Sequence, residues 1–147
     1  MIKEERNFYA FEIENCGGNF VKVRKILNGK CIYEGSCKWL SREDQEKLKT
    51  RMMYETFYKN YQKEGLPKVF NLNGFEIVKE EGKFLIKYFT CGVKTAQSSY
   101  DLKWISEEKE KIIIRKLSNL CLNNMEVENQ GYSLIFIIRE VERVIYD

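Results

Sequence analysis

The residues of this chain best suited to chemistry lie close together near its N-terminus. Phe20, Lys22 and Arg24 alternate along one stretch, with Asn15 before it and Lys25 beside it. In a strand, this alternation places the first three side chains on one face. Cations neutralise phosphates and release counterions, and an aromatic ring offers a stacking surface worth about 1–3 kcal/mol per base. The pattern is typical of a surface that binds single-stranded nucleic acid. An ordinary solvated strand face, with Phe20 covering its edge, would show the same pattern.

The chain contains no histidine. This excludes Ser-His-Asp and Cys-His nucleophiles and the usual histidine-containing zinc sites. Acidic pairs at 43–44, 80–81 and 107–108 could in principle bind Mg²⁺, but two of them stand where helices are expected to begin. Carboxylates are favoured there by the helix dipole, and no Asp-x-Asp spacing occurs. We therefore expect no enzyme activity, no metal and no cofactor.

Composition indicates one compact globular domain. The 147 residues are 44% hydrophobic and carry 25 basic against 22 acidic side chains, for a net charge of +3. That balance permits nucleic acid without requiring it. The five cysteines form no Cys-x-x-Cys pair, and we expect reduced thiols; Cys31 and Cys37 could approach one another, but buried small side chains are the commoner case. With no secretory segment and no membrane-length apolar run, we expect an intracellular protein that does not span a membrane.

The sequence pattern of the segments that must position these residues occurs twice in the chain. A Phe-Glu-Ile triplet occurs at 11–13 and again 64 residues later at 75–77, and Lys-Trp-(Leu/Ile)-Ser occurs at 38–41 and again 65 residues later at 103–106. Anchors held in the same order at near-constant spacing indicate an internal duplication.

Each copy predicts strands followed by one helix. In the first copy, alternation predicts strands at 8–15 and 19–27 and a third at 30–36, with Asn28-Gly29 as a tight hairpin turn. Ser41 is an expected N-cap for a helix reaching about residue 62. The second copy predicts strands at 75–79 and 83–90 and one or two more within 93–104. Ser106 then caps a helix, and the side chains expected to be buried on it are Ile113, Ile114, Leu117, Leu120 and Cys121.

The C-terminal segment resembles the start of a third copy. Residues 125–129 echo 11–15, and the apolar run at 134–139 predicts a strand. Since an exposed apolar strand edge invites aggregation, we expect this strand to complete a sheet or to form a homodimer. The sequence thus predicts an α+β fold with two tandem β-β-β(-β)-α repeats, at 7–64 and 71–124, packed as one domain with a partial third repeat of strands at 125–147.

Two sets of aromatic residues have structural interpretations. Trp39 and Trp104 precede the two helices at equivalent places and could stack on bases, but we expect them to pack beneath the helices. Tyr54, Tyr58 and Tyr61 lie at helical spacing, and we expect them to pack or to form a dimer or partner surface.

The repeat unit resembles the ββββα module of single-strand nucleic-acid binders, a group that includes PUR repeats, Whirly proteins and single-strand-binding transcriptional coactivators. The residues that carry the likeness to a PUR repeat are Phe8, Tyr9, Asn15, Gly18, Phe20, Lys22 and Val23. Trp39-Leu40-Ser41 resembles the coactivator family's helix entry. The resemblance implies that two repeats pack together, that a third mediates dimerisation, and that exposed sheet faces bind single-stranded DNA or RNA.

The functional positions of that family carry over only in part. Asn15 and Lys22 match positions that resemble its nucleic-acid contacts, whereas Ile13 and Asn19 stand where the family has a lysine and an arginine. In the second copy Lys79 replaces the asparagine, Ile86 replaces Lys22, and the remaining candidate cation is Lys87.

The expected function is therefore non-catalytic binding of single-stranded DNA or RNA, mainly on the first copy. The alternative is a protein-interaction module of the same fold, such as a viral or mobile-element inhibitor of a host factor, in which the nucleic-acid contacts have been lost.

Overall fold

The computed structural model describes residues 4–50, 69–90, 93–124 and 132–147, with the side chains of 48–50 and 69–72 left aside. It is an α+β fold with one antiparallel seven-stranded sheet, which confirms the predicted class. The elements in chain order are β1 (Glu5–Gly17), β2 (Phe20–Leu27), β3 (Lys30–Glu34), β4 (Lys38–Trp39), α1 (Arg42–Thr50), β5 (Val69–Glu80), β6 (Lys83–Thr90), β7 (Val93–Asp101), the 3-10 helix η1 (Leu102–Trp104), α3 (Glu107–Asn124) and α4 (Leu134–Tyr146).

The two copies of the duplicated pattern share this single sheet. Its order is β3-β2-β1-β5-β6-β7, with β4 pairing with β2 beside β3. The first strand of each copy, β1 and β5, pair antiparallel at the centre, and the later strands follow outward on either side. Ala10 pairs with Gly74, its equivalent 64 residues later, so the same position of each copy meets at the middle of the sheet.

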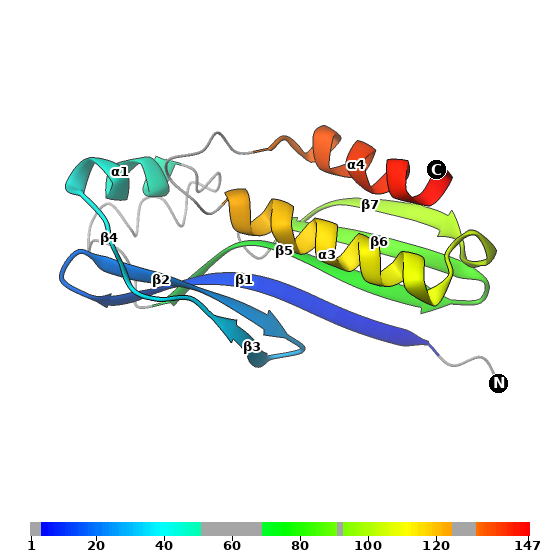
Figure 1. The fold of residues 1–147 in the computed structure, drawn as a ribbon, viewed down its shortest axis with the longest axis horizontal. Helices are drawn as coiled ribbons and strands as arrows, with labels where there is room; N and C mark the ends of the chain where they lie inside the picture. The colour runs from blue at the N-terminus through cyan, green and yellow to red at the C-terminus, as the bar shows by residue number, and fades with distance from the viewer. Residues whose placement is uncertain (1–3, 51–68, 91–92, 125–131) are drawn as a thin grey trace.

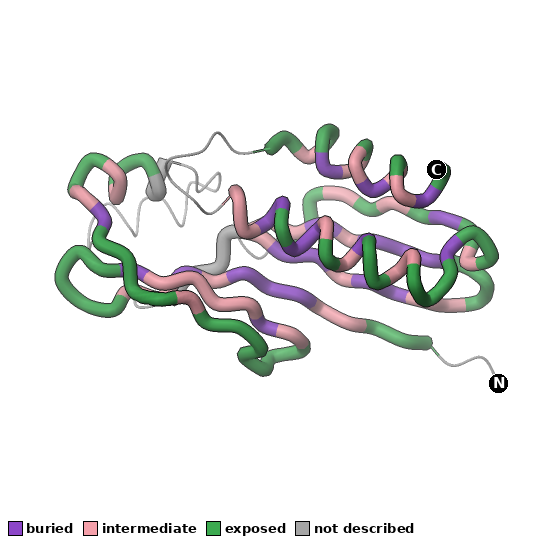
Figure 2. The backbone as a smooth tube through the Cα atoms, in the orientation of Figure 1, coloured by how far each residue is buried: buried purple, intermediate pink, exposed green. Residues whose placement is uncertain are grey.

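One face of the sheet holds the core. α3 and α4 both lie over that inner face (Figure 1), and buried residues run along β1, β5, β6 and the adjoining sides of both helices (Figure 2). Phe11 and Phe75 stack at the centre with ring centroids 6.1 Å apart. Alternation along β1 puts Tyr9, Phe11 and Ile13 inward, as predicted. The opposite, outer face carries the polar side chains of β1 and β2.

The local signals in the sequence are confirmed. Asn28 and Gly29 adopt φ of 50° and 84°, the left-handed values that a tight hairpin requires. The Ser41 hydroxyl accepts the Asp44 N–H at 3.1 Å, and the Ser106 hydroxyl accepts the Lys109 N–H at the same distance. Both serines are therefore N-caps. The helix predicted to run from Ser41 to about residue 62 corresponds to α1, which the structure describes as far as Thr50. The three tyrosines at 54, 58 and 61 lie outside the described residues.

The C-terminal prediction is wrong, because residues 134–146 form the helix α4 and no strand. The Ser133 hydroxyl accepts the Phe136 N–H at 3.2 Å and caps the helix. Ile137, Val141 and Ile145, spaced four apart, are its buried side chains. Residues 134–146 therefore do not form the predicted partial third repeat of strands, and residues 125–131 lie outside the described part. The homodimer stays a prediction, although these residues supply no strand through which it could form.

The predicted burial of the two tryptophans is also wrong. Trp39 and Trp104 are 59% and 55% exposed, and the next residue in each copy, Leu40 or Ile105, is buried instead. Each corner needs one apolar side chain beneath the helix entry, and the residue after the tryptophan fills it. Figure 1 shows the first of these corners, where β4 leads into α1 at one end of the sheet.

Candidate nucleic-acid interface

The outer face of the first hairpin presents Lys22 and Arg24 side by side, as predicted, but with carboxylates between them. The register pairs Glu12 with Arg24 and Glu14 with Lys22. Arg24 Nη2 lies 2.7 Å from Glu12 Oε2, and Lys22 Nζ lies 3.4 Å from Glu14 Oε2.

A third carboxylate completes this cluster, because Lys22 also pairs with Glu34 on β3. The ion pair with Lys22 lowers the pKa of the Glu34 carboxyl, and that with Glu34 raises the pKa of Lys22. Two cations therefore face three carboxylates. Little counterion release remains for an incoming polyanion, since the cations already have anionic partners.

The other residues predicted on this face have separate roles. Phe20 is 46% exposed and lies opposite Trp39 in the β2–β4 pairing, so the two form an exposed aromatic pair. Asn15 Oδ1 accepts the Gly17 N–H at 3.0 Å and holds the turn that follows β1.

The two lysines of the second copy do not join this cluster. Lys79 lies 2.8 Å from Glu110 Oε1 and 3.1 Å from Glu5 Oε2, which raises its pKa. Lys87 Nζ lies 3.8 Å from Glu76 Oε1. Both are therefore ion-paired within the sheet and its helix.

Lys25 differs from the other candidates, because it points to the inner side of the sheet. Its ammonium lies 5.5 Å from the centroid of the Tyr9 ring, and burial lowers its pKa. It makes no ion pair with any residue that the structure describes. Lys25 thus leaves the predicted cluster and lines a different site.

That site is a groove of about 460 Å³ between β2, β3 and α3. Lys111, Arg115 and Asn119 border it and are exposed. They lie four residues apart on α3, which places them on one helix face. Neither Lys111 nor Arg115 forms an ion pair within the described part of the chain. With Lys25, the groove therefore has three cationic side chains around it and no paired carboxylate.

The remaining groove lining supplies aromatic and polar contacts. Tyr33 on the edge strand β3 is 53% exposed, and Tyr9 and Leu122 contribute apolar surface deeper in. The Ser118 hydroxyl is buried and has no hydrogen-bond partner among the described residues. A buried hydroxyl without a partner is costly, so a ligand that hydrogen-bonds it would gain from that contact.

The sequence interpretation missed this groove apart from Lys25. A signal was present in the spacing of Lys111, Arg115 and Asn119, a polar stripe next to the apolar side of a predicted helix. The sequence did not show which strands lie beside that stripe, because β2 and α3 belong to different copies of the repeated pattern.

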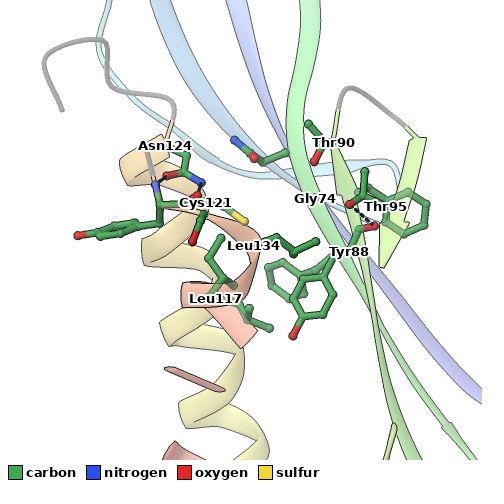
Figure 3. A pocket seen from close by; sticks show the side chains of 14 residues that line it. Gly74, Tyr88, Thr90, Thr95, Leu117, Cys121, Asn124 and Leu134 are labelled. Carbon is green, nitrogen blue, oxygen red and sulfur yellow. Dashed lines mark hydrogen bonds between the residues drawn. The ribbon is translucent and has the colours of Figure 1, made fainter. Parts of the chain in front are cut away.

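A second cavity, of about 550 Å³, lies between the β5–β6 end of the sheet and α3 and α4 (Figure 3). Phe75, Leu117 and Ile137 are among its lining, and no charged side chain is among the described residues that line it. Burial raises the pKa of the Cys121 thiol to about 12, so this cysteine is a poor nucleophile. Its lining is mainly apolar, with polar side chains such as that of Asn124, labelled in Figure 3, among it.

The described residues contain no group of three metal-ligating side chains and no helix long and apolar enough to cross a membrane. Comparison with protein-family models, with curated proteins and with solved structures found no match. Among the surfaces formed by the described residues, the groove between β2, β3 and α3 combines cations that have no carboxylate partner with an exposed aromatic ring.

Proposed function

We propose that this protein binds single-stranded nucleic acid, DNA or RNA, without catalysing a reaction on it, and that the strand lies in the groove between β2, β3 and α3. The observation that carries the proposal is the placement of Lys25, Lys111 and Arg115 around the same groove as the exposed Tyr33, with no carboxylate partner for any of the three among the described residues.

The groove matches the two demands of single-strand binding. Ammonium and guanidinium groups on its border neutralise phosphates, and Arg115 can hold a phosphate with two parallel hydrogen bonds. Tyr33 offers a ring on which a base stacks, and Asn119 offers an amide for polar base edges. A groove of about 460 Å³ has the size of a site for one small ligand, which suits a nucleotide of a single strand better than a duplex.

As part of this proposal, we interpret the scaffold as similar to that of PUR and Whirly proteins. Its support is the duplicated strand-and-helix order and the pairing of the two first strands, β1 with β5. The proposed site differs from the exposed sheet face that the resemblance implies, since that face pairs its own cations.

The test is fluorescence anisotropy with short labelled single-stranded DNA and RNA, and with a duplex for comparison. Three phosphate contacts predict that log K falls against log salt with a slope of about −2, hence roughly 15-fold weaker binding at 200 mM than at 50 mM salt. The Lys111→Ala/Arg115→Ala variant should bind more weakly and bring the slope to about −0.7.

The matched control is Lys22→Ala/Arg24→Ala, which removes the same number of cations from the outer face. Because those cations are paired with carboxylates, we expect affinity to stay nearly unchanged. If this control loses binding while the groove variant keeps it, the site lies on the outer face. If neither strand type binds at low salt, the proposed function is wrong.

A second candidate function, binding of a protein partner, is favoured by the Phe20–Trp39 pair. A contiguous exposed aromatic pair on a charge-neutralised face is the kind of surface that protein interfaces bury. Its test compares Trp39→Ala with Trp104→Ala, which removes an equally exposed tryptophan from the equivalent place in the second copy. Loss of a captured partner with Trp39→Ala alone would support this function, and equal retention in both would exclude that surface.

A further inference from the structure

Two cysteines distant in sequence meet on the outer face of the first hairpin. The Cys16 and Cys37 sulfur atoms lie 2.6 Å apart, and both residues are exposed. This is closer than two non-bonded sulfur atoms normally rest, and a little longer than the ~2.05 Å of a disulfide bond.

The backbone brings the two together from opposite sides of β2. Cys16 stands at an irregularity in the β1–β2 pairing, between Asn15 and Gly17, and such a bulge turns its side chain out of the regular ladder. Cys37 immediately precedes β4, which pairs with β2 along its other edge. The Gly35 N–H donates to the Val23 carbonyl at 2.8 Å and holds the connecting segment against β2.

We propose that Cys16 and Cys37 form a redox-sensitive pair that closes into an intramolecular disulfide by exchange with a low-molecular-weight disulfide of the glutathione type. One protein thiolate attacks a sulfur of the small disulfide, forms a mixed disulfide and releases one small thiolate. The second protein thiolate attacks the protein-bound sulfur, forms the Cys16–Cys37 bond and releases the other. Two electrons pass from the protein to the small disulfide, and the two protons lost by the cysteines are taken up by the released thiolates.

The surroundings of the pair set how readily it reacts. The hydrogen bond with Cys37, then burial, raise the pKa of the Cys16 thiol; the charge of Glu14 acts in the same direction and that of Lys22 in the opposite one. Since the thiolate is the attacking species, closure should accelerate as pH rises from 7 towards the ordinary thiol pKa of about 8.5. The inference is independent of the proposed function, because the pair lies on the outer face and the groove on the inner one.

Closure would connect the end of β1 to the entry of β4, across β2. The exposed Phe20 and Trp39 stand beside this connection, Trp39 only two residues from Cys37. Oxidation would therefore fix the segment that carries the aromatic pair, and reduction would release it.

The experiment incubates the full chain with defined mixtures of reduced and oxidised glutathione, blocks free thiols by alkylation and measures intact mass and non-reduced peptides. The expected product has two fewer alkylated thiols than the reduced chain and contains a peptide pair joined through Cys16 and Cys37. Cys16→Ser and Cys37→Ser should each lose this link and carry glutathione on the remaining cysteine. Cys31→Ser, which alters another exposed cysteine, should keep it.

Circular dichroism of each variant checks the fold, which we expect to be retained because all three cysteines are exposed. The proposal is overturned if Cys16 and Cys37 both stay alkylatable in the oxidised mixtures, if both take up glutathione without joining, or if the peptide map joins either one to a different cysteine.

Discussion

Gly74 at the centre of the sheet makes the sharpest prediction about stability. A Cβ at this position would lie 2.8 Å from the Tyr9 main-chain oxygen and 3.6 Å from both the Ala10 Cα and the Phe8 ring. The first distance is too short for a carbon and an oxygen, and the oxygen belongs to the backbone of the neighbouring strand. Gly74→Ala must therefore push β1 and β5 apart where the two copies meet.

The magnitude follows from the cost of overpacking. Inserting a methyl group into a closely packed site costs about 1–3 kcal/mol, against which the smaller unfolded-state entropy of alanine returns about 0.4–1 kcal/mol. A net loss of about 1–2 kcal/mol corresponds to roughly 3–8 °C in Tm for a chain of this size. Urea denaturation followed by circular dichroism measures the change directly, as a lower midpoint with an unchanged slope.

The matched control is Gly35→Ala. Its Cβ would meet no atom nearer than 3.5 Å, and neither glycine has a positive φ, so both variants change the unfolded chain alike. We expect Gly35→Ala to be neutral or slightly stabilising. If Gly74→Ala were as stable as Gly35→Ala, the close approach of the two central strands would not exist as described.

Three further predictions concern polar groups that are buried or half-buried. Burial raises the pKa of Cys121 and of Tyr100 to about 12 in the folded protein, so the unfolded chain loses these protons first and stability should fall as pH rises from about 9 towards 12. Urea midpoints at about pH 8 and about pH 10.5 measure this, with roughly 2 kcal/mol of the difference due to Cys121 and removed in Cys121→Ala. Tyr100→Phe should lower the free energy of unfolding by about 1 kcal/mol, because the Tyr100 hydroxyl donates a hydrogen bond to the Glu142 carboxylate. Tyr88→Phe should be neutral or stabilising, because the Tyr88 hydroxyl has no hydrogen bond of good geometry to a described residue. A larger loss of stability in Tyr88→Phe than in Tyr100→Phe would contradict this. Lys79→Met should cost about 1 kcal/mol by leaving Glu110 half-buried without its partner, and an unchanged midpoint would show that solvent screens the pair.

The parts of the fold that local residues determine were predictable from the sequence. The Asn28-Gly29 turn needs only two residues that tolerate positive φ, and the helix starts at Ser41 and Ser106 need only a hydroxyl within reach of a nearby N–H. Alternation in β1 and β2 likewise identifies which side chains point inward. These signals act over a few residues, so distant parts of the chain do not override them.

The C-terminal helix was not predictable from its apolar run alone. Five consecutive apolar residues at 134–138 fit a buried strand as well as a helix. The pattern that decides between them is the longer one, Ile137, Val141 and Ile145 at a spacing of four, which places buried side chains on one helix face. A shorter window loses this period.

The outer-face cations show how a correct strand assignment can still mislead about a site. Lys22 and Arg24 do lie side by side, but the turn at Gly18-Asn19 also brings Glu14 and Glu12 opposite them. Alternation along one strand cannot show this, because the partner strand decides whether a cation is available. The hairpin register, counted outward from the turn, contains that information.

The groove is lined by residues from both copies of the repeated pattern. Lys25 comes from the second strand of the first copy, whereas Lys111 and Arg115 come from the helix of the second. Their equivalents in the other copy of the pattern, Phe89, Glu46 and Thr50, carry no positive charge, so the repeated sequence pattern does not include these cations. Because β1 and β5 pair at the centre, α3 of the second copy lies near the hairpin of the first, and the cations meet there. The proposed site is asymmetric for this reason: positions that the two copies of the pattern share supply the core, and positions that they do not share supply the charge.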